Sequence, residues 1–324
     1  MGQGTDSKLA AFISELAPNS LRAFVTHSDT GIGHESFLAL SGHGRSLKQL
    51  KLCLHSDALP AIAYLKGCTE LETLDLEDLH GTIDMEKTQN DVFLETIAWL
   101  RECKSLREVS FKKFQSAPAL MVPILLEDRI RLEKVEIESS SYALKDSSGF
   151  HMALANQKSI QSLGLQADGE DAWGVPVSTF IDSLGKMTEL RELRLNIYNC
   201  ESIGDPQISA LATALENLEG FYINTGWNYT DAVLGPVAKL KQLRNITFGA
   251  FSRFTTDGLL EFVAQLGPGN QGMVLTVDAA DPDAGLSDDE QNLVREALNV
   301  KVGGEFGYQF WRDPDVSEFE GESD

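Results

Sequence analysis

Histidine and cysteine are the residue types of this sequence that could most readily bind a metal or act as nucleophiles. The six histidines are His27, His34, His43, His55, His80 and His151, and none of them shows H-x-x-x-H spacing. His27 and His55 follow successive strand-like segments, with Cys53 close to the second. Two imidazoles without further carboxylate or thiolate ligands make a poor metal site. We therefore expect no metal ion and no cofactor.

Motifs for catalysis or phosphate binding are also missing. The sequence has no G-x-S-x-G elbow, no Walker loop and no dinucleotide fingerprint. The glycine-rich residues 267–272 follow a predicted helix, so they cannot direct helix-start amides at a phosphate. Residues 278–285 have the acidic composition of a calcium loop, but the glycine comes one place early and Pro282 interrupts it. These observations predict that the protein is not an enzyme.

Eight segments follow the pattern L-x-x-L-x-L, with other apolar residues allowed in place of leucine, and two more, at Leu21 and Gly272, follow it weakly. They begin at Leu21, Leu47, Leu71, Leu106, Leu132, Ile160, Leu190, Leu218, Leu243 and Gly272. Successive starts lie 24 to 35 residues apart, and the longest interval indicates an insertion around residues 80–90. The fourth and sixth positions alternate with polar residues, as in a strand with one buried face. The regular spacing predicts a strand-and-helix repeat.

A stretch with helical spacing follows most of these strand segments. Phe180, Ile181 and Leu184 are one example of the i, i+3, i+4 pattern that places apolar side chains on one side of a helix. Neither the strand nor the helix can bury its apolar face alone, so the repeats must stack. We predict an α/β fold, a curved right-handed solenoid of about ten repeats. Its parallel sheet lines the concave side, and its helices cover the convex side.

The two ends of the solenoid are expected to be capped. A helix over roughly residues 7–16 precedes the first repeat, and a capping box from Ser287 to Glu290 opens the last helix. The aromatic residues 306–311 are expected to form a closing strand. Residues 313–324 contain six acids and no base, which is typical of a disordered segment. The sequence thus predicts a solenoid over residues 1–312 and an acidic disordered tail over residues 313–324.

Two cysteines give the repeats a family resemblance. Cys68 and Cys103 each lie three residues before the strand leucine, in LKGCTELETLDL and LRECKSLREVSF. This resembles the cysteine-containing leucine-rich repeats of F-box-type ubiquitin-ligase substrate receptors and, more broadly, the ribonuclease-inhibitor-like superfamily. The resemblance covers roughly residues 21–298 and implies the solenoid fold. The chain departs from the family in having no asparagine ladder and no F-box upstream of the first repeat, so adaptor binding does not simply carry over.

Charge and cysteine content narrow the choice of partner and compartment. The chain has 27 basic and 49 acidic residues, a net charge of -22, which disfavours nucleic acid and anionic membranes. A protein partner with a basic patch is favoured instead. The four cysteines are widely spread, no signal peptide is found, and no run of about 18 apolar residues occurs. We expect a monomer in the cytoplasm or the nucleus.

The binding surface is expected on the concave face of the later repeats. Outward-pointing positions of the early strands are charged, whereas those of the later strands are small and polar. Aromatic side chains, which are common in binding hot spots, border the later strands. The candidate partner-binding residues are Arg194, Tyr198, Tyr222, Asn224, Trp227, Tyr229, Phe251 and Phe254. The sequence leaves open that several of these aromatics, Phe251 and Phe254 above all, only fill irregular joints between repeats.

Three classes of function follow from these observations. The first is a protein–protein interaction scaffold or substrate-receptor-like binding module that uses the concave face and adjoining loops. The second is a regulator of a small GTPase, resembling activators that share this architecture and an acidic tail. The third is an enzyme that acts on nucleic acids or small molecules, which the charge and the missing motifs disfavour.

Overall fold

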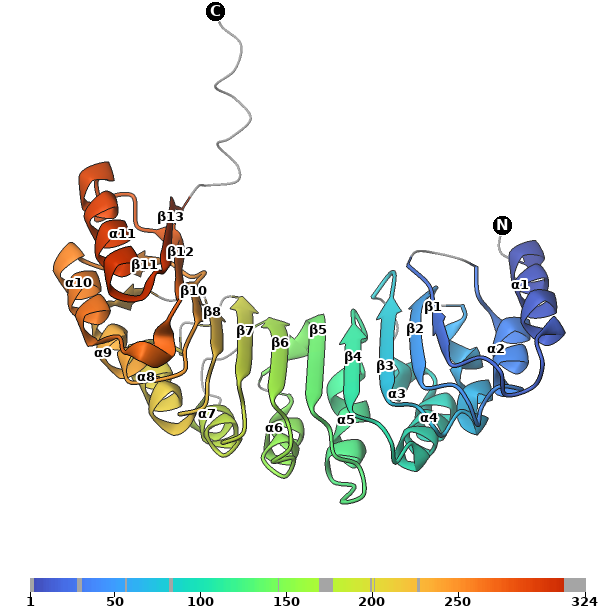
Figure 1. The fold of residues 1–324 in the computed structure, drawn as a ribbon. Helices are drawn as coiled ribbons and strands as arrows, with labels where there is room; N and C mark the ends of the chain where they lie inside the picture. The colour runs from blue at the N-terminus through green and yellow to red at the C-terminus, as the bar shows by residue number, and fades with distance from the viewer. Residues whose placement is uncertain are drawn as a thin grey trace, which may run out of the picture. The chain divides into compact units, whose positions relative to one another are not determined.

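The strands and helices of the protein form two compact units, Met1–Asp168 and Gly169–Asp324 (Figure 1). The computed structural model describes residues 3–27, 31–55, 57–81, 84–144, 146–168, 177–198, 200, 202–225 and 228–311. The acidic segment 313–324, predicted to be disordered, lies outside the described residues. None of the helices in the described ranges is long and apolar enough to cross a bilayer.

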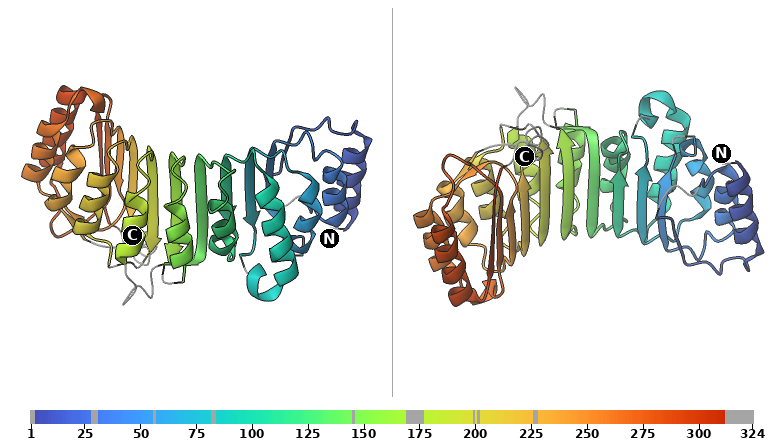
Figure 2. Two further views of the ribbon diagram at one scale, coloured as in Figure 1. Left: turned by 90° about the horizontal axis from the view of Figure 1, so that it is seen from below. Right: turned by 90° about the horizontal axis from the view of Figure 1, so that it is seen from above.

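The first unit contains six strands that pair in parallel and in chain order. The strands are β1 (Ala23–Val25), β2 (Gln49–Leu54), β3 (Thr73–Asp78), β4 (Glu108–Lys112), β5 (Lys134–Ala143) and β6 (Ser162–Asp168). The helices are α1 (Gln3–Glu15), α2 (His34–Ser41), the 3-10 helix η1 (Leu59–Gly67), α3 (Met85–Thr88), α4 (Asn90–Glu102), α5 (Ala117–Leu125) and α6 (Ser148–Leu154). The helices lie on one side of this sheet (Figure 2).

The second unit repeats this arrangement with a more elaborate edge. Its main strands pair in parallel in the order β7 (Glu192–Tyr198), β8 (Gly220–Asn224), β10 (Asn245–Phe248), β12 (Val274–Ala280) and β13 (Glu305–Phe310). Two short strands, β9 (Tyr229–Thr230) and β11 (Ser252–Arg253), extend the sheet from Ala280 of β12. The helices are α7 (Val177–Gly185), α8 (Asp205–Ala214), η2 (Asp231–Val233), α9 (Leu234–Ala238), α10 (Thr256–Gln265), η3 (Pro268–Asn270) and α11 (Asp288–Val302).

The repeat pattern predicts the strands accurately. All ten L-x-x-L-x-L segments form strands, and each strand begins two residues after the first position of its segment. In β2 and β3, buried and partly exposed residues alternate strictly, so Leu50 and Leu52 face the helices. Full burial of a leucine side chain contributes roughly 2 kcal/mol. The apolar face of each strand therefore fixes its register against the helical layer.

A ladder of aspartates and threonines joins successive repeats in the second unit. Asp205 accepts hydrogen bonds from the Thr230 main-chain N–H (3.3 Å) and hydroxyl (2.5 Å). Asp231 accepts the same pair from Thr255, at 2.9 and 2.6 Å. Each threonine is also the N-cap of the next helix, and its hydroxyl oxygen accepts a main-chain N–H there. The start of each helix is thus fixed to the repeat before it.

The predicted caps are present at both ends. Helix α1 covers the expected N-terminal segment, and Ser287 and Glu290 form the capping box of α11. Strand β13 pairs with β12 at the C-terminal end of the second unit. The predicted insertion contains α3, which begins after the N-cap Asp84.

Candidate protein-binding surface

The uncovered face of the first sheet carries rows of charged residues. One row is Lys51, Asp75, Ser110, Glu136 and Gly164, and the next is Cys53, Glu77, Lys112, Glu138 and Gln166. Lys51 Nζ lies 3.9 Å from an Asp75 oxygen, and Lys134 Nζ lies 3.7 Å from an oxygen of Glu136. Acids and bases therefore neutralise one another along part of this face.

Glu77 shows the same neutralisation at the end of β3. Its carboxylate accepts a hydrogen bond from Lys113 Nζ at 2.9 Å. This hydrogen bond is the main reason why the pKa of Glu77 lies below its usual value, with the charges of Lys113 and Lys112 acting in the same direction. A partner that binds here must first displace lysines from their carboxylates, because the charges are already paired.

The uncovered face of the second sheet differs in size and charge. Its central row, in register across the strands, is Arg194, Tyr222, Thr247, Thr276 and Gly307. Arg194 is exposed, while Tyr222 and Asn224 are half-buried. Because its neighbours toward β13 are threonines and a glycine, Tyr222 is the largest side chain in this row. The structure therefore brings Arg194, Tyr222 and Asn224 together on one face, as the sequence predicts.

Gly249 makes room for Tyr222. A Cβ atom at position 249 would lie 3.1 Å from the Tyr222 hydroxyl oxygen and 3.1 Å from Asn224 Cβ. Gly249 follows β10 directly, and its N–H donates to the Ile223 carbonyl at 2.8 Å. The phenol ring of Tyr222 thus extends across the sheet toward the carboxyl end of β10.

An exposed aromatic pair lies beyond these strand ends. The rings of Phe251 and Trp311 are 6.2 Å apart between centroids and meet at 70°. The Trp311 N–H donates to the Ala280 carbonyl at 2.9 Å, which fixes its backbone at the end of β12. Trp311 remains 45% exposed and its neighbour Phe310 42%. Large aromatic side chains that are held rigidly yet exposed are typical of binding hot spots.

Charged groups lie near the aromatic pair. Arg253 Nε donates to Asp281 at 2.6 Å, and the arginine side chain is 55% exposed. Hydrogen bonds from the Asp283 N–H and from Arg253 lower the pKa of Asp281. On the open face, partial desolvation raises the pKa of Asp278. The region combines exposed apolar surface with one fixed ion pair and a carboxylate, Asp278, that faces solvent.

Two predicted contact residues belong to the core instead. Tyr229 is 0% exposed and Phe254 only 2%, so neither can touch a partner in this structure. Both pack against Phe248, with ring centroids 5.9 and 4.8 Å away, and the Tyr229 hydroxyl bonds the Thr225 hydroxyl. Tyr229 lies in the short strand β9, and Phe254 directly follows β11. The alternative that aromatics fill the joints is therefore correct for Tyr229 and Phe254, whereas Phe251 stays half-exposed.

The remaining candidates are less completely described, and the exposed Trp311 was not among them. Trp227 lies outside the described residues. The backbone of Tyr198 ends β7, but its side chain lies outside the described part. Trp311 was predicted only as part of a closing strand. Its position just after the strand, where alternation no longer buries every second residue, is the signal that could have identified it.

The chain's potential metal ligands and nucleophiles form no larger cluster in the described ranges. His55 Nδ1 and His80 Nε2 are 3.1 Å apart. Within the described ranges, no group of three or more histidine, cysteine, aspartate or glutamate side chains is arranged to hold a metal ion. Burial raises the pKa of Cys68 and of Cys103 to about 12, which keeps both thiols protonated near neutral pH.

Comparison with known proteins extends the fold assignment. No protein-family model matches the sequence, and no curated protein matches it. A chain in the crystal structure of the yeast Rad7–Elc1 complex is similar, with 14% identity over 91% of this chain and 76% of that chain and a TM-score of 0.52. An internalin from Listeria monocytogenes is 14% identical over 85% of this chain and 71% of its own (TM-score 0.46). The leucine-rich-repeat-containing protein LegL7 from Legionella pneumophila is 12% identical over 92% and 95%, respectively (TM-score 0.45).

These likenesses concern the fold, because the identities are low. Together with the ten strand-and-helix repeats, the likeness at a TM-score of 0.52 supports an α/β leucine-rich-repeat solenoid with a parallel sheet.

Proposed function

We propose that the protein is a non-enzymatic interaction module that binds another protein through the second unit. The exposed aromatic pair Phe251–Trp311 carries this proposal. Tyr222 and Arg194 on the adjoining face provide a second aromatic group and an exposed cation, and the threonines and glycine that continue the row beyond Tyr222 are small. An extended segment of a partner that lies along this face would contact both groups.

The charge of the chain supports a partner with a basic patch. A net charge of -22 attracts basic protein surfaces and repels phosphate backbones and anionic lipids. Asp278 offers a carboxylate on the open face to such a partner. Under this proposal, lysine or arginine side chains of the partner lie toward Asp278, and apolar side chains lie toward Trp311.

A substrate-receptor-like role is a narrower form of the same proposal. It is supported by the family resemblance at Cys68 and Cys103, which are buried at the ends of η1 and α4. The similar yeast chain comes from a complex of two proteins, Rad7 and Elc1. A pull-down with ubiquitin-ligase adaptors tests this form. If no adaptor binds, the narrower role fails while the binding module stands.

The four cysteines support the proposed compartment. Cys53, Cys68, Cys103 and Cys200 are all free thiols in the structure. Reduced cysteines are typical of the cytoplasm and the nucleus, where we propose that the protein acts. Fluorescence microscopy of the tagged full chain checks this, and a secreted protein would contradict it.

Affinity capture with matched variants tests the binding surface. Tyr222→Ala with Trp311→Ala removes two aromatic contacts, and truncating hot-spot residues typically weakens binding at least ~30-fold. The control is Lys112→Ala with Glu138→Ala, which truncates two side chains of similar exposure on the first sheet. We expect a captured partner to lose affinity for the first variant and to keep it for the control, at equal thermal stability. Unchanged affinity for both variants would overturn the proposal.

A further inference from the structure

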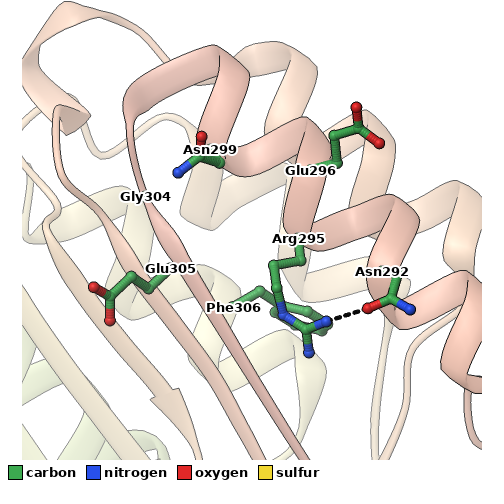
Figure 3. Close-up of a pocket in the computed structure, with 7 residues that line it drawn as sticks. All are labelled: Asn292, Arg295, Glu296, Asn299, Gly304, Glu305 and Phe306. Carbon is green, nitrogen blue, oxygen red and sulfur yellow. Dashed lines mark hydrogen bonds between the residues drawn. The ribbon is translucent and has the colours of Figure 1, made fainter.

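Helix α11 and strand β13 form an open end of the second unit. Between them lies a hollow of about 540 Å³. It is lined by Asn292, Arg295, Glu296, Asn299, Gly304, Glu305 and Phe306 (Figure 3). Arg295 extends toward Phe306, and its guanidinium donates a hydrogen bond to Asn292. This end is polar, with opposite charges close together, and so differs from the apolar layers inside the unit.

Four polar residues form a stripe along the exposed side of α11. Asn292, Arg295, Glu296 and Asn299 are spaced three, one and three residues apart, which places them on one side of the helix. All four are exposed. In the part of the chain that the structure describes, neither Arg295 nor Glu296 forms an ion pair. The stripe thus presents one unpaired cation beside one unpaired anion.

The stripe is self-complementary under two-fold symmetry. Its four positions are symmetric about the midpoint between Arg295 and Glu296. When two copies of a helix meet antiparallel across a two-fold axis at that midpoint, Arg295 faces Glu296 of the partner subunit, and Asn292 faces Asn299 of the partner subunit. Two ion pairs and two amide pairs form at once. A parallel arrangement would instead oppose like charges.

The outer edge of β13, which faces away from β12, is compatible with the same two-fold axis. The Glu305 N–H donates to the carbonyl of Met273, the residue just before β12, at 2.8 Å. Because main-chain groups alternate along a strand, those of Phe306 and Tyr308 point to the other edge. No strand among the described residues pairs with that edge. An exposed strand edge is a template for another strand, and a two-fold axis that brings α11 helices together antiparallel also makes two β13 strands antiparallel.

We propose that this end binds a second copy of the chain, giving a two-fold homodimer through the α11 stripe and the β13 edge. The self-complementary charges select this occupant over an unrelated protein. The proposal replaces the monomer expected from the sequence. Each chain has a net charge of -22, so the two copies repel at long range. Near 0.15 M salt, where the screening length is about 8 Å, that repulsion is weak while direct contacts persist.

Sedimentation velocity of the full chain over a range of concentrations, near 0.15 M salt, tests the dimer. We expect a species of twice the 35.5 kDa chain mass. Arg295→Glu opposes two pairs of carboxylates across the axis and should weaken dimerisation roughly tenfold or more. Glu296→Arg should do the same. The double variant Arg295→Glu/Glu296→Arg restores complementarity and should return the dimerisation constant to within about threefold of the original.

Controls separate this contact from its alternatives. Lys186→Glu changes the net charge as much as Arg295→Glu, on an exposed residue away from α11, and should leave dimerisation within about twofold. A chain that stays monomeric up to about 100 μM, or a double variant that fails to restore the dimer, would overturn the proposal. Species that grow beyond the dimer would indicate head-to-tail stacking instead. A dimer that forms only after residues 312–324 are removed would identify that segment as the occupant. Thermal unfolding confirms that each variant is folded.

Discussion

The two uncovered sheet faces of this protein are built from the same repeat but differ in how their side chains are paired. On the first unit, lysines and carboxylates alternate between neighbouring strands, and pairs such as Lys113–Glu77 hold each other in place. On the second unit, threonines and glycines surround Tyr222, and the aromatic pair Phe251–Trp311 stays exposed. The comparison teaches that the repeat fixes the backbone, while the outward positions decide whether a face satisfies itself or stays available for a partner.

The largest expected difference between the units is in acid sensitivity. All six histidines belong to the first unit. His151 is buried, and its Nε2 lies 2.7 Å from the Tyr142 hydroxyl. Burial lowers the pKa of His151 from 6.5 to about 4. Below pH 6.5 the unfolded chain takes up a proton that the folded chain excludes, so stability falls as the pH drops toward 4. The difference between the two pKa values corresponds to a loss of roughly 3 kcal/mol of unfolding free energy in total.

His151→Gln should remove this acid sensitivity, because glutamine does not titrate. We expect its unfolding free energy, relative to that of the original chain, to rise by roughly 3 kcal/mol between pH 7 and pH 4. Urea unfolding at several pH values measures the difference, and hydrogen exchange of β5 and α6 locates it in the first unit. If the two chains lose stability in parallel as the pH falls, His151 is not the responsible group.

The next largest effect is a loss of stability that should be equal in the two units. In each unit, a buried side-chain amide joins two repeats through hydrogen bonds to main-chain carbonyls. Gln157 Nε2 donates to the Leu125 and Ile130 carbonyls, both at 3.0 Å. Asn270 Nδ2 donates to the Leu240 and Leu243 carbonyls, both at 2.9 Å. Both amides are buried.

Substitution of either amide by alanine removes two hydrogen bonds to main-chain carbonyls, and we expect each variant to lose about 2–3 kcal/mol. Asn156→Ala and Gln271→Ala, exposed neighbours of the two sites, serve as controls and should change stability by less than about 0.5 kcal/mol. Thermal and urea unfolding measure all four variants. A much smaller loss at one site would show that water replaces the amide there and that the two units are not sealed alike.

These paired amides also show what sequence reasoning could and could not reach. The strand starts follow from apolar alternation, so the positions of the ten strands that begin in L-x-x-L-x-L segments were predictable, whereas the short strands β9 and β11 were not. The joints were not, because the residues that seal them differ from repeat to repeat. The joints are sealed by cysteine at Cys68 and Cys103, by glutamine at Gln157 and by asparagine at Asn270. A search for a regular asparagine ladder therefore finds none, although hydrogen bonds between successive repeats are present.

The candidate site residues show the same difference between regular strands, which are predictable, and irregular joints, which are not. Arg194, Tyr222 and Asn224 lie in regular strands, and strand periodicity places them on the open face. Tyr229 and Phe254 follow irregular turns, where periodicity gives no direction. There the rings of Tyr229, in β9, and of Phe254, just after β11, both lie in the core. Exposure after the end of a strand depends on tertiary packing, and for that reason the sequence also misses Trp311.

The salt dependence of stability should also differ between the two faces, but by less than the effects above. Lys113→Gln removes the ion pair with Glu77, which is partly exposed, so we expect a loss of less than about 1 kcal/mol at low salt that shrinks further near 1 M salt. Arg194 forms no ion pair within the described ranges. Arg194→Gln should therefore change stability by less than about 0.5 kcal/mol at either salt concentration. Urea unfolding at both concentrations gives the comparison. Equal salt dependence of the two variants would contradict the distinction between a self-paired and an open face.

The smallest expected effect compares one glycine on each open face. A Cβ atom at Gly164 would lie 3.4 Å from Glu136 Cγ, an ordinary contact with a flexible side chain. At Gly249 it would lie 3.1 Å from both Asn224 Cβ and the Tyr222 hydroxyl. Alanine restricts the unfolded chain at both positions, which stabilises by about 0.4–1 kcal/mol where the folded state accepts it. We therefore expect Gly164→Ala to raise the unfolding free energy by about 0.5 kcal/mol. Gly249→Ala should gain nothing or lose stability, because Tyr222 and Asn224 must move. Urea unfolding of the two variants decides the order, and a larger gain at Gly249 would mean that Tyr222 does not rest over that glycine.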